Sequence, residues 1–229
     1  KRRAQQLHHD DTIHMIHTSG TTGTPKGVLL SHGNIIENAL AMAKQMKLAP
    51  EDRMCVQAPL FHCFGCVACT VTSVIAGCSM VIIGRFRSNL TLNAIEREKC
   101  TVASGVPTMF LSFIDEMEKD IYDITPLRTG IIAGAPCPPE LAEAIINTLG
   151  MDEIIMSYGL TETSPCITAT ETDDPLELKI NTVGCAIPGV EIRIIDPVTH
   201  KPVKWGEQGE ICARGYNVMK GYYKMPEET

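Results

Sequence analysis

A run of hydroxyl-bearing residues and glycines near the start of the chain has the composition of a phosphate-binding loop. It reads Thr18-Ser19-Gly20-Thr21-Thr22-Gly23-Thr24-Pro25-Lys26-Gly27. Glycines allow a tight turn whose backbone N–H groups form a cradle for an anion, and the hydroxyls add further donors. Lys26 adds a mobile positive charge. The alternative is an ordinary polar surface turn, but so many hydroxyl groups between two apolar segments favour a phosphate site.

Two widespread nucleotide-binding loops do not match this run. A P-loop requires Gly-x4-Gly-Lys followed by Ser or Thr, whereas Lys26 is followed by Gly27. A dinucleotide fold requires Gly-x-Gly-x-x-Gly after its first strand, and that spacing is missing here. The run therefore predicts a phosphate site of another kind.

A second polar cluster follows an apolar segment in the later half of the chain. It reads Tyr158-Gly159-Leu160-Thr161-Glu162. Taken singly, Tyr158 is typical of a strand end in the core, and Glu162 is typical of a solvated cap. His62, which lies beside Phe61, is likewise more typical of a structural histidine than of a catalytic one. Directly after an apolar strand, and together with the phosphate loop, the cluster favours a functional site.

Five motifs in chain order resemble those of the AMP-forming acyl-CoA synthetases and their adenylate-forming relatives. They are His17–Gly27, Pro59–His62, Gly134-Ala135-Pro136, Tyr158–Glu162, and the set Gly209-Glu210-Ile211, Arg214-Gly215 and Gly221-Tyr222. The flanking residues Pro138–Leu141 and Ser164-Pro165 look closest to the medium-chain fatty acid branch. The resemblance covers most of the chain.

This resemblance implies an enzyme that joins a carboxylic acid, expected to be a medium- or long-chain fatty acid, to ATP, forming an acyl-adenylate and pyrophosphate. The acyl group then passes to the thiol of coenzyme A, and AMP is released. The expected co-substrates and cofactors are ATP, Mg²⁺ and coenzyme A. Catalysis of this kind depends on positioning and on stabilising charge at the phosphates.

The resemblance also implies a role for each matching residue. The predicted catalytic residues are Lys26, His62, Thr161 and Glu162. Residues 18–26 would hold the β- and γ-phosphates, Thr161 would donate to the α-phosphate, and Glu162 would hold Mg²⁺. His62 would help to place the substrate carboxylate.

The remaining matches would form the adenine and acyl parts of the site. Tyr158 would lie along one face of the adenine, and Gly134, Ala135 and Pro136 would close the other side. Gly159 would leave room for the acyl chain. Two alternatives stay open: an adenylate-forming enzyme whose acceptor is not coenzyme A, and a non-catalytic nucleotide-binding module.

The order of apolar segments predicts an α/β fold with a mostly parallel sheet covered by helices, because strands alternate with amphipathic helices. The predicted strands are 12–17, 27–30, 53–58, 79–83, 101–105, 129–134 and 153–159. The predicted helices are 65–76, 90–99 and 108–119, with one starting at Pro138 and another near Asn34, which is paired with Glu37 as its cap.

The last part of the chain changes period. Alternating residues at 190–194 and 211–213 predict a smaller antiparallel β extension. We expect residues 1–11 to be a linker, 12–184 to be the α/β part of an AMP-binding domain, and 185–229 to be the β extension. The chain starts with Lys1, not Met, and ends at Thr229, so we expect a segment of a longer protein. The resemblance implies that this segment stops before a hinge and a C-terminal domain and is inactive alone.

Composition limits the partners. The formal charge is −7, from 20 Lys and Arg against 27 Asp and Glu, which predicts no general attraction to nucleic acid. The longest apolar run, 63–77, is shorter than the roughly 20 residues that span a bilayer, so no transmembrane segment is predicted. The oligomeric state is left open.

Ten cysteines lie mostly inside apolar strings, which is typical of free thiols in a reducing compartment: the cytoplasm or, in a eukaryote, the mitochondrial matrix. Cys63, Cys66 and Cys69 have a spacing that also occurs in iron–sulfur sites, but a fourth ligand with its proline is missing, which disfavours a cluster.

Overall fold

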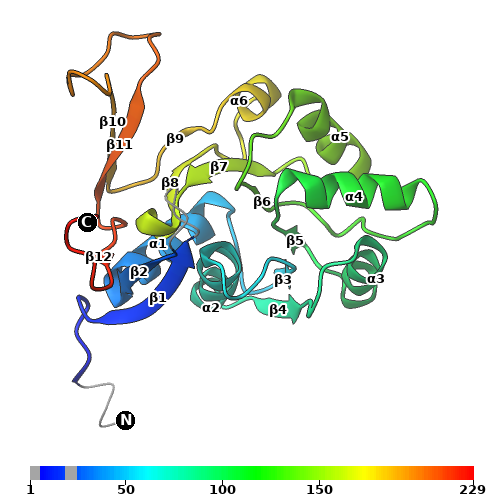
Figure 1. Cartoon of the computed structure of the whole chain (residues 1–229). Coiled ribbons are helices and arrows are strands. Elements are labelled where there is room, and N and C mark those ends of the chain that lie inside the picture. Colours follow the sequence, from blue (N-terminus) through cyan, green and yellow to red (C-terminus); the bar gives the residue numbers. More distant parts are fainter. Residues whose placement is uncertain (1–5, 19–24) are drawn as a thin grey trace.

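Short parallel strands form the centre of the fold, in the order β4-β3-β5-β6-β7 (Figure 1). The structure is a computed structural model and describes residues 6–18 and 25–229. The strands are β3 (Arg53–Val56), β4 (Ser79–Ile82), β5 (Val102–Ala103), β6 (Ile131–Ile132) and β7 (Ile155–Gly159). Isolated parallel bridges from Val102 to Thr129 and from Gly105 to Ile132 join β5 to β6.

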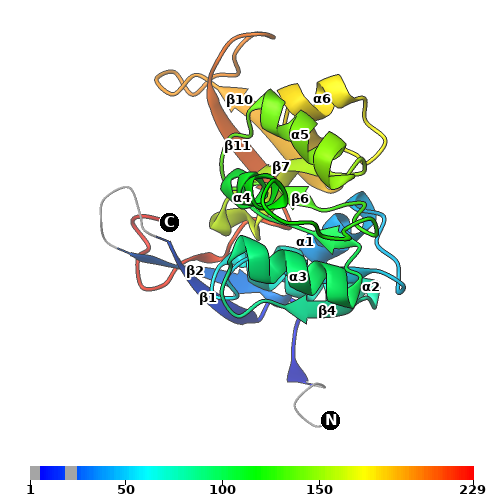
Figure 2. The same ribbon diagram turned by 90° about the vertical axis from the view of Figure 1, so that its right-hand side faces the viewer.

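Helices cover both faces of this sheet (Figures 1 and 2). One face carries α1 (His32–Gln45), the π-helix η2 (Phe64–Val71) and α2 (Thr72–Ala76). The other carries α3 (Ser88–Glu98), α4 (Pro107–Met117) and α5 (Pro139–Leu149), with α6 (Leu176–Asn181) beside α5. The predicted α/β architecture, a mostly parallel sheet covered by helices, is confirmed.

Successive strand residues point to opposite cores, as the pleat of a β-strand requires. Ile131 and Ile155 belong to the core under α1, whereas Ile132 and Met156 belong to the core under α3, α4 and α5. A strand buried on both faces reads as a continuous apolar run, so the sequence gives its position without showing which residue faces which layer.

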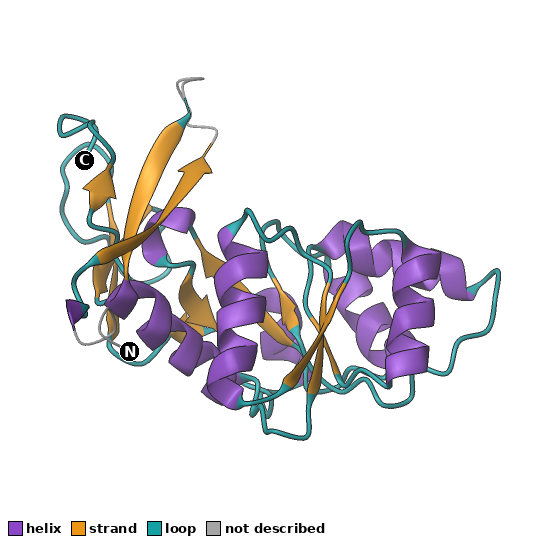
Figure 3. Ribbon diagram, turned by 90° about the horizontal axis from the view of Figure 1, so that it is seen from below, coloured by secondary structure: helices purple, strands orange, loops and turns teal. Residues whose placement is uncertain are grey.

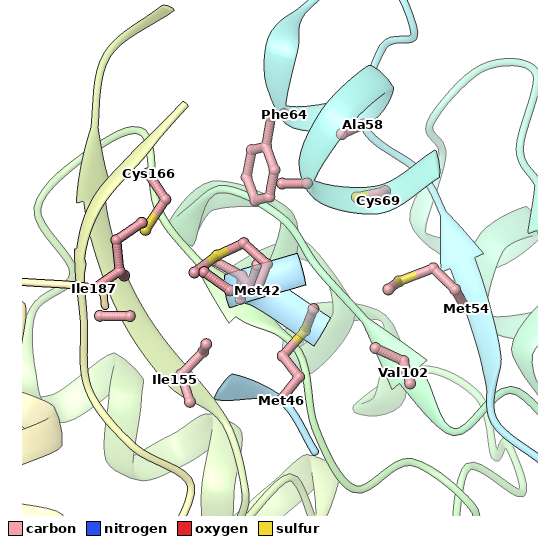
Figure 4. Close-up of a cluster of buried hydrophobic side chains, with 14 of the residues drawn as sticks. Met42, Met46, Met54, Ala58, Phe64, Cys69, Val102, Ile155, Cys166 and Ile187 are labelled. Atoms are coloured by element: carbon pink, nitrogen blue, oxygen red, sulfur yellow. The ribbon is translucent and has the colours of Figure 1, made fainter. Parts of the chain in front are cut away.

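Methionines from α1 fill the centre of the first core. Figure 4 shows Met42 and Met46 between Ile155 on one side and Met54 and Val102 on the other. Met42 lies in α1 and Met46 is the C-cap of that helix, and both side chains are almost fully buried. Methionine is unbranched and adapts to irregular gaps, so it suits a helix that crosses strands of unequal length.

The first two strands do not belong to the parallel sheet. β1 (Thr12–Thr18) and β2 (Lys26–Ser31) pair with each other in antiparallel fashion, and β12 (Gly221–Tyr222) adds to β2. Figure 3 shows this hairpin projecting past the helices. The reason is the short connection: antiparallel strands need only a short loop, whereas parallel strands need a long crossover.

Helix α1 begins three residues earlier than the sequence predicts. Its N-cap is Ser31, whose Oγ accepts a hydrogen bond of 3.2 Å from the Asn34 N–H, while Asn34 Oδ1 accepts one of 2.8 Å from the Ser31 N–H. The predicted cap at Asn34 with Glu37 is therefore wrong. Asn34 instead completes the capping box from inside the first turn.

The helix predicted at 65–76 is split into two types. The chain forms the π-helix η2 as far as Val71 and then α2. Thr70 Oγ1 donates to the Gly65 carbonyl at 2.8 Å, and Thr72 Oγ1 donates to the Val67 carbonyl at 3.0 Å. Apolar periodicity indicates a helix here but cannot separate these two hydrogen-bond patterns.

Several short elements after Gly159 have no sequence signal strong enough for prediction. They are the 3₁₀ turn η3 (Thr161–Thr163), β8 (Cys166–Ala169), α6 and β9 (Cys185–Ala186). β8 is buried along its whole length, so it lacks alternation, and it pairs antiparallel with both β7 and β9. β10 (Val190–Ile195) and β11 (Glu210–Gly215) form the antiparallel pair that the sequence predicts.

None of the helices within 6–18 and 25–229 has both the length and the apolar character needed to cross a bilayer. The domain boundaries at 11 and 184 stay predictions.

A cluster of charged side chains ties together the amino ends of the parallel strands. Arg128, before β6, binds Asp52, before β3, through Nη2–Oδ2 at 2.6 Å and Nε–Oδ1 at 3.2 Å. Arg128 also pairs with Glu153, before β7. Thr101, before β5, donates to Asp52 Oδ1 at 2.6 Å. The side chain of Asp52 is only 5% exposed.

Burial raises the pKa of Asp52, but hydrogen bonds from Arg128, Thr101 and the Ala49 amide outweigh it, and the net pKa lies below the ordinary 3.8. A carboxyl group whose pKa is lower in the folded state stabilises the fold above its unfolded pKa. That contribution is lost as the pH falls below about 4 through the folded-state pKa.

Asp52→Asn is therefore expected to lower the free energy of unfolding at pH 7 by about 3 kcal/mol, because it leaves Arg128 without its buried partner. Urea unfolding across pH 3 to 7 measures the loss, which should shrink below pH 4. Asp173→Asn is the control, because its pair with Lys47 is exposed to solvent and contributes little to stability. Equal losses in the two variants would contradict this role for Asp52.

Candidate active site

A cavity of about 420 Å³ lies beside the carboxyl ends of β6 and β7. It brings together residues that are far apart in the sequence and were predicted as site residues. They are Thr18, His62, Gly134, Gly159, Thr161 and Glu162. Ligand sites of open α/β sheets lie at this end of the strands.

The other predicted residues lie elsewhere. Ala135 and Pro136 line a second cavity, of about 430 Å³, together with residues 179–184. Tyr158 is half-buried and packs against the α1 core. Ser19, Gly20, Thr21, Thr22, Gly23 and Thr24 lie outside the described residues. The adenine-binding roles of Tyr158, Ala135 and Pro136 stay predictions.

The described ends of the phosphate run are held by the β1–β2 hairpin. Thr18 at the end of β1 is paired with Lys26 at the start of β2, directly after Pro25. His17 and Thr18 both line the first cavity. The hairpin therefore brings both ends of the predicted phosphate loop to the side of the sheet where Glu162 lies.

Glu162 is held from two sides. Its Oε1 accepts a hydrogen bond of 2.8 Å from the hydroxyl of Tyr222, and its backbone carbonyl accepts one of 2.8 Å from the Met219 N–H. The carboxylate is half-buried and lines the cavity. Oε1 of this group accepts one hydrogen bond from the Tyr222 hydroxyl. Each carboxylate oxygen can accept about two hydrogen bonds, so both oxygens of Glu162 can accept more.

The turn that carries Thr161 and Glu162 is fixed by two buried asparagines. Asn38 Nδ2 donates to the carbonyls of Cys166 at 2.9 Å and Thr163 at 3.4 Å, and Asn38 Oδ1 accepts from the Cys166 N–H at 3.2 Å. Asn217 Nδ2 donates to the same Cys166 carbonyl at 2.9 Å. These side chains thus supply partners for the Thr163 carbonyl in the turn and for the backbone of Cys166, where the chain rejoins the sheet.

The segment that carries Asn217 is bound in turn to α1. Asn34 Nδ2 donates to the carbonyls of Tyr216 at 2.5 Å and Val218 at 3.0 Å. Sequence reasoning missed Asn34, Asn38 and Asn217 as supports of the site. The only signal was a polar residue on the apolar face of the first helix, at Asn38.

His62 is held as a neutral ring. The Phe64 N–H donates to His62 Nδ1 at 3.1 Å, so Nδ1 is the acceptor and the proton lies on Nε2. Burial lowers the pKa of His62, which also favours the neutral form. The side chain lines the cavity, where a neutral imidazole can donate one hydrogen bond to a substrate oxygen.

The three clustered cysteines have different surroundings. Cys63 Sγ lies 3.5 Å from Thr161 Oγ1, Cys66 Sγ lies 3.7 Å from His14 Nδ1, and Cys69 is buried in the α1 core. Within the described part of the chain, no group of three or more potential ligands is arranged to hold a metal ion. Burial raises the pKa of the Cys63 thiol, which keeps it protonated beside Thr161.

Gly159 has a packing reason for its lack of a side chain. A Cβ at this position would lie 1.8 Å from the carbonyl oxygen of Pro165. The close approach occurs where the pairing of β7 with β8 shifts in register. Gly159 also lines the cavity, and its predicted role in leaving room for an acyl chain stays a prediction.

Comparison with known proteins identifies the family. The AMP-binding enzyme family matches residues 1–223. The chain belongs to the AMP-binding enzyme family. The resemblance seen in the motifs is thereby confirmed.

Related chains include acyl-CoA ligases. The Bacillus subtilis protein YngI is 47% identical over 227 residues, which are 99% of this chain and 41% of YngI. The mitochondrial medium-chain acyl-CoA ligase of Bos taurus is 41% identical over 224 residues, which are 96% of this chain and 36% of that protein.

Solved structures of two ATP-bound bacterial proteins have the same fold. ATP-bound MatB from Rhodopseudomonas palustris has a TM-score of 0.88 at 31% identity, over 97% of this chain and 43% of MatB. o-Succinylbenzoate coenzyme A synthetase from Bacillus subtilis, in complex with ATP and magnesium ion, has a TM-score of 0.82 at 33% identity, over 94% of this chain and 44% of that enzyme. This member of the AMP-binding family spans about two fifths of the length of such relatives.

Asn38→Ala is expected to lower the free energy of unfolding of this AMP-binding chain by about 2–3 kcal/mol, because it removes three hydrogen bonds and leaves buried backbone groups without partners. Urea denaturation measures the change. Asn93→Ala is the matched control, since Asn93 is also a helical asparagine but lies exposed and bonds only within α3. A loss of less than about 0.5 kcal/mol in both variants would remove Asn38 as a support of the turn.

Proposed function

We propose that this protein activates a carboxylic acid, a medium- or long-chain fatty acid, with ATP and transfers the acyl group to coenzyme A. A carboxylate oxygen attacks the α-phosphorus, the bond from that phosphorus to the bridging oxygen breaks, and pyrophosphate leaves. The thiolate sulfur of coenzyme A then attacks the acyl carbon, and AMP leaves. The observation that carries the proposal is the single cavity lined by Thr161, Glu162 and His62, with the ends of the phosphate run beside it.

The residues present fit a magnesium ion held together with a nucleotide. Mg²⁺ is usually bound through one or two carboxylates together with substrate phosphates, and Glu162 supplies one carboxylate that is already oriented by a hydrogen bond. When bound, the ion would neutralise charge that develops on the phosphates. The structure of o-succinylbenzoate coenzyme A synthetase in complex with ATP and magnesium ion supports ATP and Mg²⁺ as the groups that this site would bind.

Each of three polar side chains would position a different part of the substrates. Thr161 Oγ1 would donate to the α-phosphate, and Lys26 would balance the charge of the leaving pyrophosphate. His62 would donate its Nε2 proton to the substrate carboxylate and so hold it in line with the α-phosphorus. Bringing these reactants together in a fixed geometry is the larger part of such catalysis.

The apolar wall of the cavity supports an acid with a hydrocarbon chain. Met42, Phe64, Ala68 and Ile131 line it, and none of these side chains offers a strong hydrogen-bonding group. A methylene removed from water into such a wall contributes about 0.8 kcal/mol. The medium-chain acyl-CoA ligase among the relatives supports the same class of acid.

The cysteines support a reducing compartment, the cytoplasm or the mitochondrial matrix. All ten are free thiols, and the Bos taurus relative is a mitochondrial enzyme. Because the chain spans about two fifths of its relatives, we also propose that the 229 residues alone bind nucleotide without sustained acyl-CoA synthesis. Steady acyl-CoA synthesis by the purified 229 residues would refute the proposal that they lack sustained activity.

The reaction is tested by pyrophosphate–ATP exchange in the protein at its natural full length. Exchange is expected with medium- and long-chain fatty acids and not without a carboxylic acid. Coenzyme A is then compared with an acyl-carrier protein as the acceptor. If none of a panel of fatty, aromatic and dicarboxylic acids supports exchange, adenylation is refuted. If the acyl group is transferred only to the carrier protein, the proposed acceptor is refuted.

Glu162→Gln is expected to slow the exchange at least about a hundredfold, because it removes the carboxylate charge while keeping the shape of the side chain. The melting temperature should change by no more than a few degrees, since the amide oxygen can still accept from Tyr222. Glu191→Gln serves as the control, because that carboxylate lies on the exposed β10–β11 pair with Arg214. If the melting temperature falls by much more than a few degrees along with the exchange rate, Glu162 has a structural role.

A further inference from the structure

Tyr222 lies where the chain returns to the phosphate-loop hairpin. In β12 it is paired with Val28 of β2, and the neighbouring Tyr223 N–H donates to the Gly27 carbonyl at 2.8 Å. This pairing holds the backbone at 222 close to the start of β2. The sequence motif includes Tyr222, but sequence reasoning gave it no role.

The side chain of Tyr222 contacts two predicted site residues that come from different parts of the chain. Its hydroxyl donates to Glu162 Oε1 at 2.8 Å. Its ring lies below Lys26, with Nζ 4.8 Å from the ring centroid. A single side chain therefore joins the predicted metal ligand to the lysine of the predicted phosphate loop.

Both contacts leave the charges of Lys26 and Glu162 available to ligands. The ring face attracts the ammonium through its quadrupole without neutralising it, so Lys26 keeps its charge for a phosphate. The hydroxyl donates to one lone pair of Glu162 Oε1 and so limits rotation of the Glu162 side chain. Partners that orient a metal ligand in this way influence metal affinity strongly.

The direction of the hydrogen bond between Tyr222 and Glu162 is fixed by the two groups. An ionised carboxylate can only accept, so the phenol hydroxyl is the donor and Glu162 Oε1 is the acceptor.

We propose that Tyr222 is a positioning residue of the nucleotide site, which orients Glu162 for Mg²⁺ through its hydroxyl and holds Lys26 for the phosphates through its ring. This inference rests on the proposed function, because it takes Mg²⁺ and ATP as the ligands. The two contacts are separable by mutation, since phenylalanine keeps the ring and leucine removes both groups.

The chain offers a matched control at the next position. Tyr223 also has a lysine over its ring, with Lys224 Nζ 5.2 Å from the centroid. Its side chain is 48% exposed, and it is not among the residues that line the first cavity. Substitutions at 223 therefore remove a similar tyrosine and cation contact at a distance from Glu162.

The test is calorimetric binding of ATP, without a carboxylic acid, to the protein at its natural full length at a series of free Mg²⁺ concentrations. Tyr222→Phe should raise the Mg²⁺ concentration needed for half-maximal ATP binding about tenfold. It should leave the ATP dissociation constant at saturating Mg²⁺ within about twofold of the wild type, because the ring under Lys26 remains. Tyr223→Phe should match the wild type.

Two further variants separate the contacts. Tyr222→Leu should also weaken ATP binding at saturating Mg²⁺ by about threefold, because it removes the ring under Lys26. In a Glu162→Gln background, Tyr222→Phe should have no added effect on the Mg²⁺ dependence, since the residue acts through that carboxylate. If Tyr222→Leu does not fold, Tyr222→Phe and the double variant decide the outcome.

A Mg²⁺ dependence unchanged in Tyr222→Phe, or an equal change in Tyr223→Phe, would overturn the inference. An added effect of Tyr222→Phe in the Glu162→Gln background would do the same, because Tyr222 would then act by another route. Wild-type protein that binds no ATP at any Mg²⁺ concentration would instead refute the proposed function. The two failures are therefore distinct.

Discussion

The alignment of the parallel sheet depends on the ion pair between Arg128 and Asp52. Strands β5 and β6 are only two residues long, and they are joined by isolated bridges and by backbone hydrogen bonds between residues 101–105 and 128–133. The Arg128 cluster adds contacts from the segments that precede β3, β5, β6 and β7, all at the amino ends. The first cavity lies at the other end of this sheet, beside the carboxyl ends of β6 and β7. Because the pair is almost fully buried on the Asp52 side, its geometry matters more than its net contribution to stability.

At the carboxyl ends of the strands, the chain must leave the sheet rather than stay aligned in it. The turn from Thr161 to Thr163 must leave the sheet to present its side chains to the cavity, and its backbone groups then lose their ladder partners. Asn38 donates to the Thr163 carbonyl of the turn, and Asn38 and Asn217 both donate to the carbonyl of Cys166, where the chain rejoins the sheet as β8. Buried amides and carbonyls of this kind are costly to leave unsatisfied. The site thus depends on α1 and on the segment after β11, although neither Asn38 nor Asn217 lines the cavity. Rigid supports of this type keep reacting groups in place before a substrate arrives.

Much of the fold and part of the site could be predicted from the sequence. The central strands and large helices have clear apolar periods, and the motifs predicted the six residues that meet in the first cavity. The pairing of β1 with β2 was missed because a strand pattern does not state its partner, and only the short connection favours a hairpin. β8 was missed because full burial removes alternation. The contacts of Asn38, Asn217 and Tyr222 join segments more than 50 residues apart, and no local pattern encodes such pairs.

The acidic composition and the proposed anionic ligand are compatible because the two act over different distances. Charges beyond about 10 Å are largely screened at ordinary ionic strength, so the net charge of −7 has little effect inside a half-enclosed cavity. In the proposed site a triphosphate would meet local groups: donor hydroxyls, the Lys26 ammonium at the start of β2, and a carboxylate that is favourable only when a cation lies between it and the phosphates. In that proposal Glu162 would be a selective element as well as a ligand, since without a divalent ion it would repel the nucleotide. Tyr222, in contact with both Glu162 and Lys26, lies where these opposing charges must be balanced.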